Sequence, residues 1–163
     1  MGAVGRCAMV TLQPARPDDG PSLNRICYPH YAPDEMERAL LASLGQAETG
    51  RGIRLVAEQD GQIVGSGQLS SWFQGAEIAD LIVIPSHRGQ GIGQALIEAL
   101  LEQARTLGLP AVEIGVQADN QRALTLYQRL GFTYRRTACL TLNGNRSTFI
   151  YLELKSLGVG GRK

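Results

Sequence analysis

The 163-residue sequence predicts an α/β fold in which helices flank one mixed β-sheet, with the element order β-α-α-β-β-β-α-β-α-β-β. Two hairpin signals, at residues 60–61 and 143–145, predict antiparallel strand pairs. From residue 91 the apolar residues recur at intervals of three and four, which predicts a long helix. The strand before that helix is apolar on both faces, as expected for a central strand covered on both sides. These features favour antiparallel hairpins together with a parallel crossover.

The N-terminal third is predicted to contain one strand and two helices. The first strand covers Ala8–Leu12 and is stopped by the prolines that follow it. A short helix, for which Asp18 offers the N-cap, covers about Pro21–Tyr28. The second helix covers Asp34–Leu44, where the large apolar residues have helical spacing, and Gly45 helps to end it.

Three strands are predicted next. Ile53–Glu58 and Gln62–Leu69 are separated by the dipeptide Asp60-Gly61, a signal for a two-residue hairpin turn. Ala76–Ile84 follows, and its C-terminal half is almost entirely apolar. This third strand is the predicted centre of the sheet.

The C-terminal half is predicted to alternate helices and strands. A helix from Gly91 to Leu107 is followed by a strand at Ala111–Val116 and a helix at Gln121–Leu130. Thr133–Leu142 and Arg146–Leu154 then form a hairpin. Residues 8–155 are predicted to form a single domain, and the glycine-rich ends, 1–7 and 156–163, are predicted to be flexible tails.

Composition excludes several classes of protein. Apolar residues make up 44% of the chain, charged residues 19%, and the formal net charge is +1, so no basic surface for nucleic acid is expected. The three cysteines (Cys7, Cys27 and Cys139) are scattered, which argues against a disulfide framework or a metal site. The first ten residues lack a signal-peptide core, and no segment approaches the roughly 20 apolar residues of a membrane span. The sequence therefore predicts a cytoplasmic protein without metal, membrane or nucleic-acid partners.

The strongest chemical signal is the loop Pro85–Gly93, between the central strand and the long helix. A helix N-terminus presents unpaired amide groups and the positive end of the helix dipole, and glycines let an anion approach the backbone. Such a loop can cradle a diphosphate. The lysine of a nucleotide-binding P-loop is missing, and the glycine spacing does not fit the dinucleotide fingerprint.

Two motifs in this region resemble those of the GNAT superfamily of N-acyltransferases. The acyl-CoA signature Arg/Gln-x-x-Gly-x-Gly/Ala is matched by Arg88, Gly91 and Gly93. A second block, from Asn120 through Ala123 and Tyr127 to Leu130-Gly131-Phe132, follows one strand later, as in that superfamily. The resemblance covers Glu77–Phe132, about a third of the chain, and implies a GNAT-like fold with acetyl-CoA as co-substrate.

The resemblance also implies a donor site. Amides of the glycine-rich loop would hold the CoA pyrophosphate, and the backbone of Ile82 and Val83 would pair with the pantetheine arm. The Val83 amide would polarise the thioester carbonyl, and Asn120 would touch the CoA arm. The implied cofactor-binding residues are Ile82, Val83, Arg88, Gly89, Gln90, Gly91, Ile92, Gly93, Gln94, Asn120 and Tyr127.

Tyr127 is the expected general acid for the departing thiolate, although a tyrosine here could also simply pack on its helix. Glu77 is the first choice for the general base, because it stands six residues before Val83, where the histone-acetyltransferase branch carries its glutamate. Protein N-terminal acetyltransferases place a glutamate where this chain has Gly115, and Glu113 is the second choice. Asp80, His87 and His30 are remoter choices, and a chain of water molecules could replace a single base.

The acceptor is expected over the sheet, near the first two helices and the loop around Ser70–Gln74. Its aromatic residues Tyr28, Tyr31, Trp72 and Phe73 could surround an ammonium group or serve only in packing. The predicted reaction is transfer of the acetyl group to a primary amine of a small molecule. The alternatives are acetylation of a protein lysine or N-terminus, or an acyl-CoA sensor without catalysis. Edge strands of the last hairpin permit a homodimer.

Overall fold

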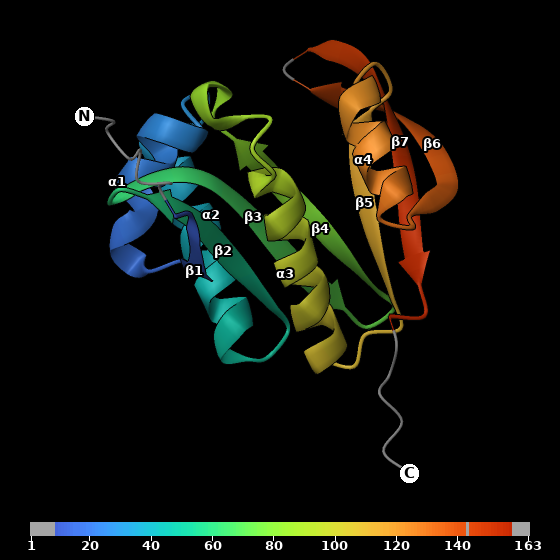
Figure 1. The fold of residues 1–163 in the computed structure, drawn as a ribbon, viewed down its shortest axis with the longest axis horizontal. Coiled ribbons are helices and arrows are strands. Elements are labelled where there is room, and N and C mark those ends of the chain that lie inside the picture. Colours follow the sequence, from blue (N-terminus) through green and yellow to red (C-terminus); the bar gives the residue numbers. More distant parts are fainter. Residues whose placement is uncertain (1–8, 143, 158–163) are drawn as a thin grey trace, which may run out of the picture.

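The computed structural model describes residues 9–142 and 144–157. Within them lies one seven-stranded sheet with the strand order β1-β2-β3-β4-β5-β7-β6 (Figure 1). Only β4 and β5 pair in parallel among the described strands. The elements are β1 (Thr11–Pro14), α1 (Gly20–Ser22), α2 (Pro33–Glu48), β2 (Gly52–Gln59), β3 (Gln62–Trp72), β4 (Gly75–Val83), α3 (Ile92–Thr106), β5 (Ala111–Gln117), α4 (Gln121–Arg129), β6 (Thr133–Leu142) and β7 (Asn145–Lys155). The predicted element order and fold class are confirmed.

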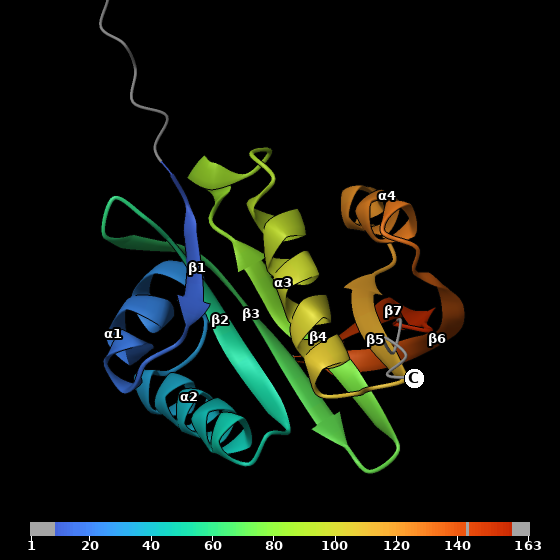
Figure 2. The ribbon, with the colours of Figure 1, turned by 60° about the horizontal axis from the view of Figure 1, so that its bottom comes forward.

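Two hydrophobic clusters lie on opposite faces of the sheet. Helices α3 and α4 cover one face, and α1 and α2 cover the other (Figures 1 and 2). The α3 face is built around fully buried side chains such as Leu96, Leu100 and Ile114. The α2 face is smaller and includes Leu23 and Met36. The sheet is thus covered on both faces at β3 and β4, as the apolar central strand predicts.

The first strand and first helix differ from the sequence predictions. β1 occupies Thr11–Pro14, whereas Ala8 lies outside the described residues. Because β1 is an edge strand, Pro14 is tolerated at its end without an N–H. The predicted helix Pro21–Tyr28 is instead a 3-10 turn, α1, and a π-helical turn that ends at Cys27.

Helix α2 is longer than predicted. It runs through Gly45 to Glu48, and the chain turns only at Gly50, where φ is +67°. A Cβ at Gly45 would meet no other atom within 4 Å. Packing of Met36 and Leu40 against the sheet outweighs the helix penalty of about 1 kcal/mol for one glycine.

Both predicted hairpins are present. The turn between β2 and β3 has φ values of +52° at Asp60 and +77° at Gly61, as a tight turn with two left-handed residues requires. In the second hairpin, Asn143 lies outside the described residues. Past β7, Leu157 is only 4% exposed and its carbonyl accepts a hydrogen bond from Arg105 Nε at 2.8 Å. Of the two predicted tails, residues 1–7 and 158–163 lie outside the described part of the chain.

A bulge interrupts β4 in its second half. Ser66 of β3 pairs with Ile82 and Gln68 pairs with Ala79, so that two residues of β4, Asp80 and Leu81, oppose one residue of β3. Asp80 has φ +52°, a left-handed conformation. Residues four positions apart on a regular strand point to the same face of the sheet. The extra residue at the bulge changes this, so that such residues on either side of it point to opposite faces. Ile78 therefore packs in the α3 cluster, whereas Ile82 packs in the α2 cluster.

The same half of β4 separates from β5. The two strands pair only at Glu77–Glu113 and Ile78–Ile114, although each continues in the same direction beyond these pairs. Figure 1 shows the strands diverging toward their C-terminal ends. The β5 side of β4 beyond Ile78 is thus open for another extended chain.

Candidate active site

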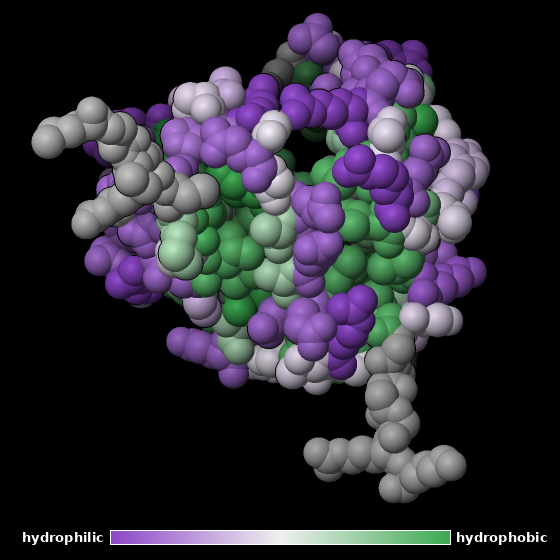
Figure 3. All heavy atoms as spheres, viewed as in Figure 1, coloured by the Kyte–Doolittle hydropathy of each residue, from purple (hydrophilic) through white to green (hydrophobic). Residues whose placement is uncertain are grey.

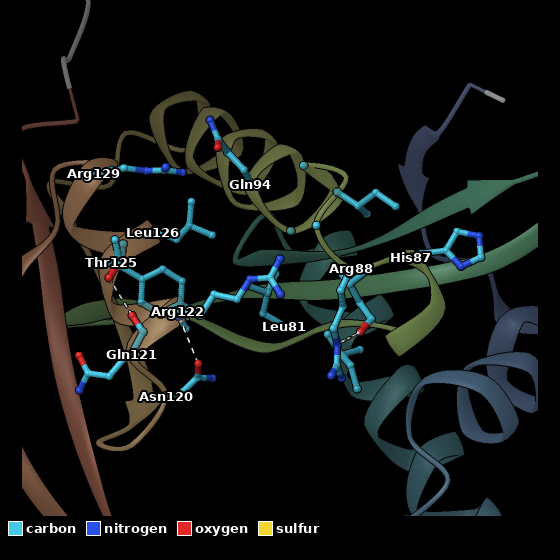
Figure 4. A pocket seen from close by; sticks show the side chains of 18 residues that line it. Leu81, His87, Arg88, Gln94, Asn120, Gln121, Arg122, Thr125, Leu126 and Arg129 are labelled. Atoms are coloured by element: carbon cyan, nitrogen blue, oxygen red, sulfur yellow. Dashed lines mark hydrogen bonds between the residues drawn. The ribbon is translucent and has the colours of Figure 1, made fainter. Parts of the chain in front are cut away.

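A cleft of about 910 Å³ opens between the diverging end of β4, the start of α3, and α4 (Figure 4). Figure 3 shows a hollow on this side of the molecule, bordered by hydrophilic side chains. The lining residues are Leu81, Ile82, Val83, His87, Arg88, Gly89, Gly91, Ile92, Gly93, Gln94, Asn120, Gln121, Arg122, Ala123, Thr125, Leu126, Tyr127 and Arg129. The cleft thus brings together every residue of the implied donor site except Gln90.

The start of α3 offers backbone donors to the cleft. Gly91 is its N-cap with φ +82°, and Gly89 has φ +75°. A Cβ is strained by roughly 1–2 kcal/mol in this conformation, which explains the glycines. Beyond Gly91, the amides of the first helical turn have no partners within the helix. An anion in the cleft can therefore accept several hydrogen bonds from the main chain.

The peptide groups of Val83 face the cleft. Val83 is opposite Gly65 of β3, and the hydrogen bond beside this pair runs from the Ile84 amide to the Val64 carbonyl at 2.9 Å. In an antiparallel ladder this pattern makes Val83 and Gly65 a non-hydrogen-bonded pair, so that the Val83 N–H points away from β3. It points to the side from which β5 has diverged. The Val83 carbonyl accepts a hydrogen bond from Arg88 Nε at 3.0 Å, which ties the loop to the end of β4.

Helix α4 forms the opposite wall. Asn120 caps it, because Asn120 Oδ1 accepts a hydrogen bond from the Ala123 amide at 3.1 Å (Figure 4). Tyr127 is 6% exposed and its ring lies 6.1 Å from that of Phe132. Burial raises the pKa of Tyr127 to about 12, so that its phenol stays protonated at neutral pH.

Part of this wall lies outside the residues that the sequence predicts for the site. Residues 122, 125, 126 and 129 also line the cleft from α4, and two of them are arginines. Their spacing of three, four and seven places them on one helical face. That spacing is visible in the sequence, but the second motif marks Asn120, Ala123 and Tyr127 on this helix and none of these four residues.

Glu77 and Glu113 lie on the other face of the sheet, at the point where β4 and β5 separate. They are partners in the parallel ladder. Burial, and then the nearby Glu113 charge, raise the pKa of Glu77, while Arg136 opposes this rise. Arg136 Nη2 lies 3.0 Å from Glu113 Oε1, and its guanidinium stacks on the Tyr151 ring at 3.8 Å. Glu113 is thus paired with a cation, whereas none of the ion pairs among residues 9–142 and 144–157 involves Glu77.

A buried arginine fixes the bulge in β4. The Arg54 side chain is 1% exposed, and its Nη2 lies 2.9 Å from Asp80 Oδ2. Arg54 Nε donates to Ser43 Oγ of α2 at 3.2 Å. The Tyr28 hydroxyl donates to the backbone carbonyl of Asp80. Both the side chain and the main chain of Asp80 are therefore held from the α2 side.

The four aromatic residues of the predicted acceptor wall lie in two separate places. Tyr28 is buried and engaged with Asp80, and Tyr31 stacks on it at 5.7 Å between ring centroids. Trp72, the last residue of β3, is 52% exposed, and Phe73, in the turn between β3 and β4, is 99% exposed. That turn precedes β4, and at about 3.3 Å per residue it lies roughly 27 Å from Val83. Neither Trp72 nor Phe73 lines the cleft.

The two histidines are separated. His30 is exposed, and its ring lies 4.5 Å from that of Tyr31 on the α2 side. His87 lines the cleft, with its Nδ1 2.8 Å from Ser86 Oγ. Only His87 therefore reaches the predicted donor site.

The chain belongs to the acetyltransferase (GNAT) family, whose family model matches residues 20–132. The resemblance of the two motifs is thus confirmed. None of the helices in residues 9–142 and 144–157 is long and apolar enough to cross a membrane.

Individual relatives agree with this assignment. The chain is 32% identical over 83 residues to the L-amino acid N-acyltransferase MnaT of Escherichia coli (strain K12), a match that covers 48% of each protein. The chain thus spans about half the length of that relative. It is 30% identical over 126 residues to an uncharacterised N-acetyltransferase of Mycobacterium tuberculosis (strain ATCC 25618 / H37Rv), covering 73% of this chain and 81% of that one.

A solved structure shows the same fold. The structure of yncA from Salmonella typhimurium with acetyl-CoA has a TM-score of 0.76 at 22% sequence identity, covering 90% of this chain and 93% of that one.

Proposed function

We propose that the protein transfers the acetyl group of acetyl-CoA to a primary amine of a small molecule, by direct attack of the amine on the thioester. The observation that carries this proposal is one cleft in which the Val83 amide and the first turn of α3 face Tyr127 across the gap. Family membership supports acetyl-CoA as the donor.

Donor binding follows from the backbone. The amides at the start of α3 suit the diphosphate of CoA, and the open side of β4 suits the extended pantetheine arm. With the arm paired there, the thioester carbonyl would accept a hydrogen bond from the Val83 amide. Such a preorganised donor stabilises the oxyanion that forms when the amine attacks.

Glu77 suits the role of general base. An alkyl amine has a reference pKa of about 10.4 and must lose a proton before it attacks. A carboxylate with a raised pKa is a stronger base than an ordinary one, and Glu77 lies on the face opposite α3 and α4. An amine that approaches from the α2 side would meet Glu77 before it reaches the thioester.

Tyr127 suits the protonation of the leaving group. The proton of its phenol would pass to the CoA sulfur as the C–S bond breaks, and the proton taken from the amine would restore the phenol through solvent. With reference thiol pKa values near 8.5, a phenol of pKa about 12 transfers its proton at a free-energy cost of roughly 5 kcal/mol. Tyr127 would therefore act first as a hydrogen-bond donor to the sulfur, with the transfer completed as the amide forms.

The neighbourhood of Gly115 favours a small acceptor over a protein N-terminus. A Cβ at Gly115 would lie 2.8 Å from the Tyr151 ring, so a glutamate cannot be placed there without moving Tyr151. Glu113 on the same strand is held by Arg136. The Tyr151 ring therefore occupies the space that a glutamate at position 115, as in N-terminal acetyltransferases, would need. A relative whose name describes an L-amino acid acyltransferase points in the same direction.

An amine panel tests the proposal. Polyamines, amino acids, aminoglycosides and short peptides are incubated with acetyl-CoA, and thiol release is followed with product mass. The proposal predicts acetylation of at least one small amine, and loss of turnover in Tyr127→Phe. Tight CoA binding without turnover on any member would support the sensor alternative, and turnover on peptides alone would support the protein-modifying one.

A further inference from the structure

The cleft carries more positive charge than the start of α3 supplies. Three arginines (Arg88, Arg122 and Arg129) line it, and no aspartate or glutamate does. None of the ion pairs among residues 9–142 and 144–157 involves Arg122 or Arg129. These charges are therefore not neutralised by the protein itself, and an anionic ligand would gain from both.

The three arginines have different surroundings. Arg88 donates a hydrogen bond to the Val83 carbonyl and so holds the loop against the end of β4. Arg122 and Arg129 are seven residues apart, so both project from the cleft face of α4. Figure 4 shows both side chains extending from α4 toward α3. Arg122 Nη2 lies 3.2 Å from the position that a Cβ of Gly89 would occupy, so its guanidinium spans the cleft at the level of the loop.

The proposed donor offers one anionic group beyond its diphosphate. CoA carries a phosphate monoester on the 3′ oxygen of its ribose, and such a group has nearly two negative charges at neutral pH. The amides at the start of α3 are suited to the diphosphate, which leaves the α4 arginines for the monoester. A guanidinium binds phosphate oxygens through two parallel hydrogen bonds, which makes arginine the suitable residue.

We propose that Arg122 and Arg129 bind the 3′-phosphate of CoA, so that the protein selects acetyl-CoA over donors that lack this phosphate. The inference rests on the proposed function, because it places CoA in this cleft. It goes further by assigning two residues of α4 to one particular phosphate and by predicting discrimination between donors.

Calorimetric titration with CoA and with 3′-dephospho-CoA tests the assignment. The wild-type protein is expected to bind CoA at least about tenfold more tightly than the dephospho ligand. In the double variant Arg122→Gln/Arg129→Gln, most of this preference disappears, whereas the affinity for 3′-dephospho-CoA changes less than about threefold. Adenosine 3′,5′-bisphosphate, as a smaller probe, binds the wild type and not the double variant.

The ligand comparison separates the competing outcomes. Equal losses for CoA and dephospho-CoA in the double variant would show that the arginines serve the diphosphate, and equal affinities of the wild type for both ligands would also overturn the inference. Either result leaves the donor site intact, whereas failure of the wild type to bind CoA at all would overturn the proposed function and the inference together. Arg38→Gln, which removes one exposed charge from α2, is the matched control and keeps the preference.

Discussion

Glu77 and Glu113 are direct partners across the only parallel strand pair among the described strands, at the last position but one before β4 and β5 separate. Only Glu113 is paired with an arginine. Two adjacent carboxylates thus have different surroundings, and burial raises the pKa of Glu77, the one that lacks such a partner. This asymmetry provides a reason to assign the base role to Glu77.

Glu77→Gln is expected to lower kcat/KM by about 10²-fold near neutral pH, because the amine must then lose its proton unaided. A base acts in its deprotonated form, so the wild-type rate rises with pH through the raised pKa of Glu77. The defect of the variant shrinks as pH approaches the pKa of the amine. Profiles of kcat/KM against pH for both proteins measure this.

Arg136→Gln and Glu37→Gln are the controls for that experiment. Loss of Arg136 removes the cation that lowers the pKa of Glu77, so the rising limb of the profile moves to higher pH. Glu37 is exposed on α2, and its loss leaves the profile unchanged. A defect in Glu77→Gln that is the same at every pH would remove Glu77 from the mechanism.

Tyr127→Phe is expected to lower kcat by about 10²-fold or more while the affinity for CoA changes less than about threefold, because the phenol acts on the leaving sulfur and not on the bound nucleotide. Stopped-flow turnover and calorimetry measure the two quantities. Tyr134→Phe, which alters an exposed tyrosine of β6, serves as the matched control. Equal losses in turnover and affinity would instead indicate that Tyr127 only packs.

Gly91→Val is expected to abolish measurable CoA binding while the domain stays folded. A Cβ at Gly91 meets no atom within 4 Å, so the change costs mainly the left-handed strain of about 1–2 kcal/mol. The side chain stands where the ligand would approach the main chain. Gly61→Val carries the same strain in the β2–β3 turn, at φ +77°, and should bind CoA normally. Undiminished binding by Gly91→Val would contradict a backbone cradle at this position.

Asp80→Ala is expected to lower the free energy of unfolding by about 3 kcal/mol, because Arg54 is left buried without its carboxylate. The bulge then loses one of its two anchors, so KM for acetyl-CoA rises in the protein that remains folded. Asp34→Ala breaks an exposed ion pair with Arg38 and costs roughly 0–0.5 kcal/mol. Urea unfolding of both variants gives the comparison, and equal small losses would show that the buried pair does not hold the bulge.

Local patterns in the sequence predict much of this fold. The period of three and four in α3, the Asp60-Gly61 turn and the glycine-rich loop depend on neighbours along the chain, and each is found where predicted. The bulge at Asp80 depends on the register between β3 and β4, which involves residues far apart in sequence. No local pattern encodes that register.

The site shows the same division between local and long-range information. The residues of the proposed donor site lie in two short motifs that the sequence displays directly, whereas Arg54 acts through Asp80, 26 residues away, and has no local signal. Trp72 and Phe73 were expected near the acceptor because they are aromatic. Residue type alone does not state where a side chain lies, and neither of these two residues lines the cleft.

The backbone cradle at the start of α3 is tested by a crystal structure of the protein with bound acetyl-CoA. In that structure, diphosphate oxygens are expected within about 2.7–3.1 Å of main-chain nitrogens at the start of α3, and the thioester oxygen is expected at the same range from the Val83 nitrogen. A donor bound elsewhere on the surface, or one whose diphosphate makes no contact with that backbone, would contradict it.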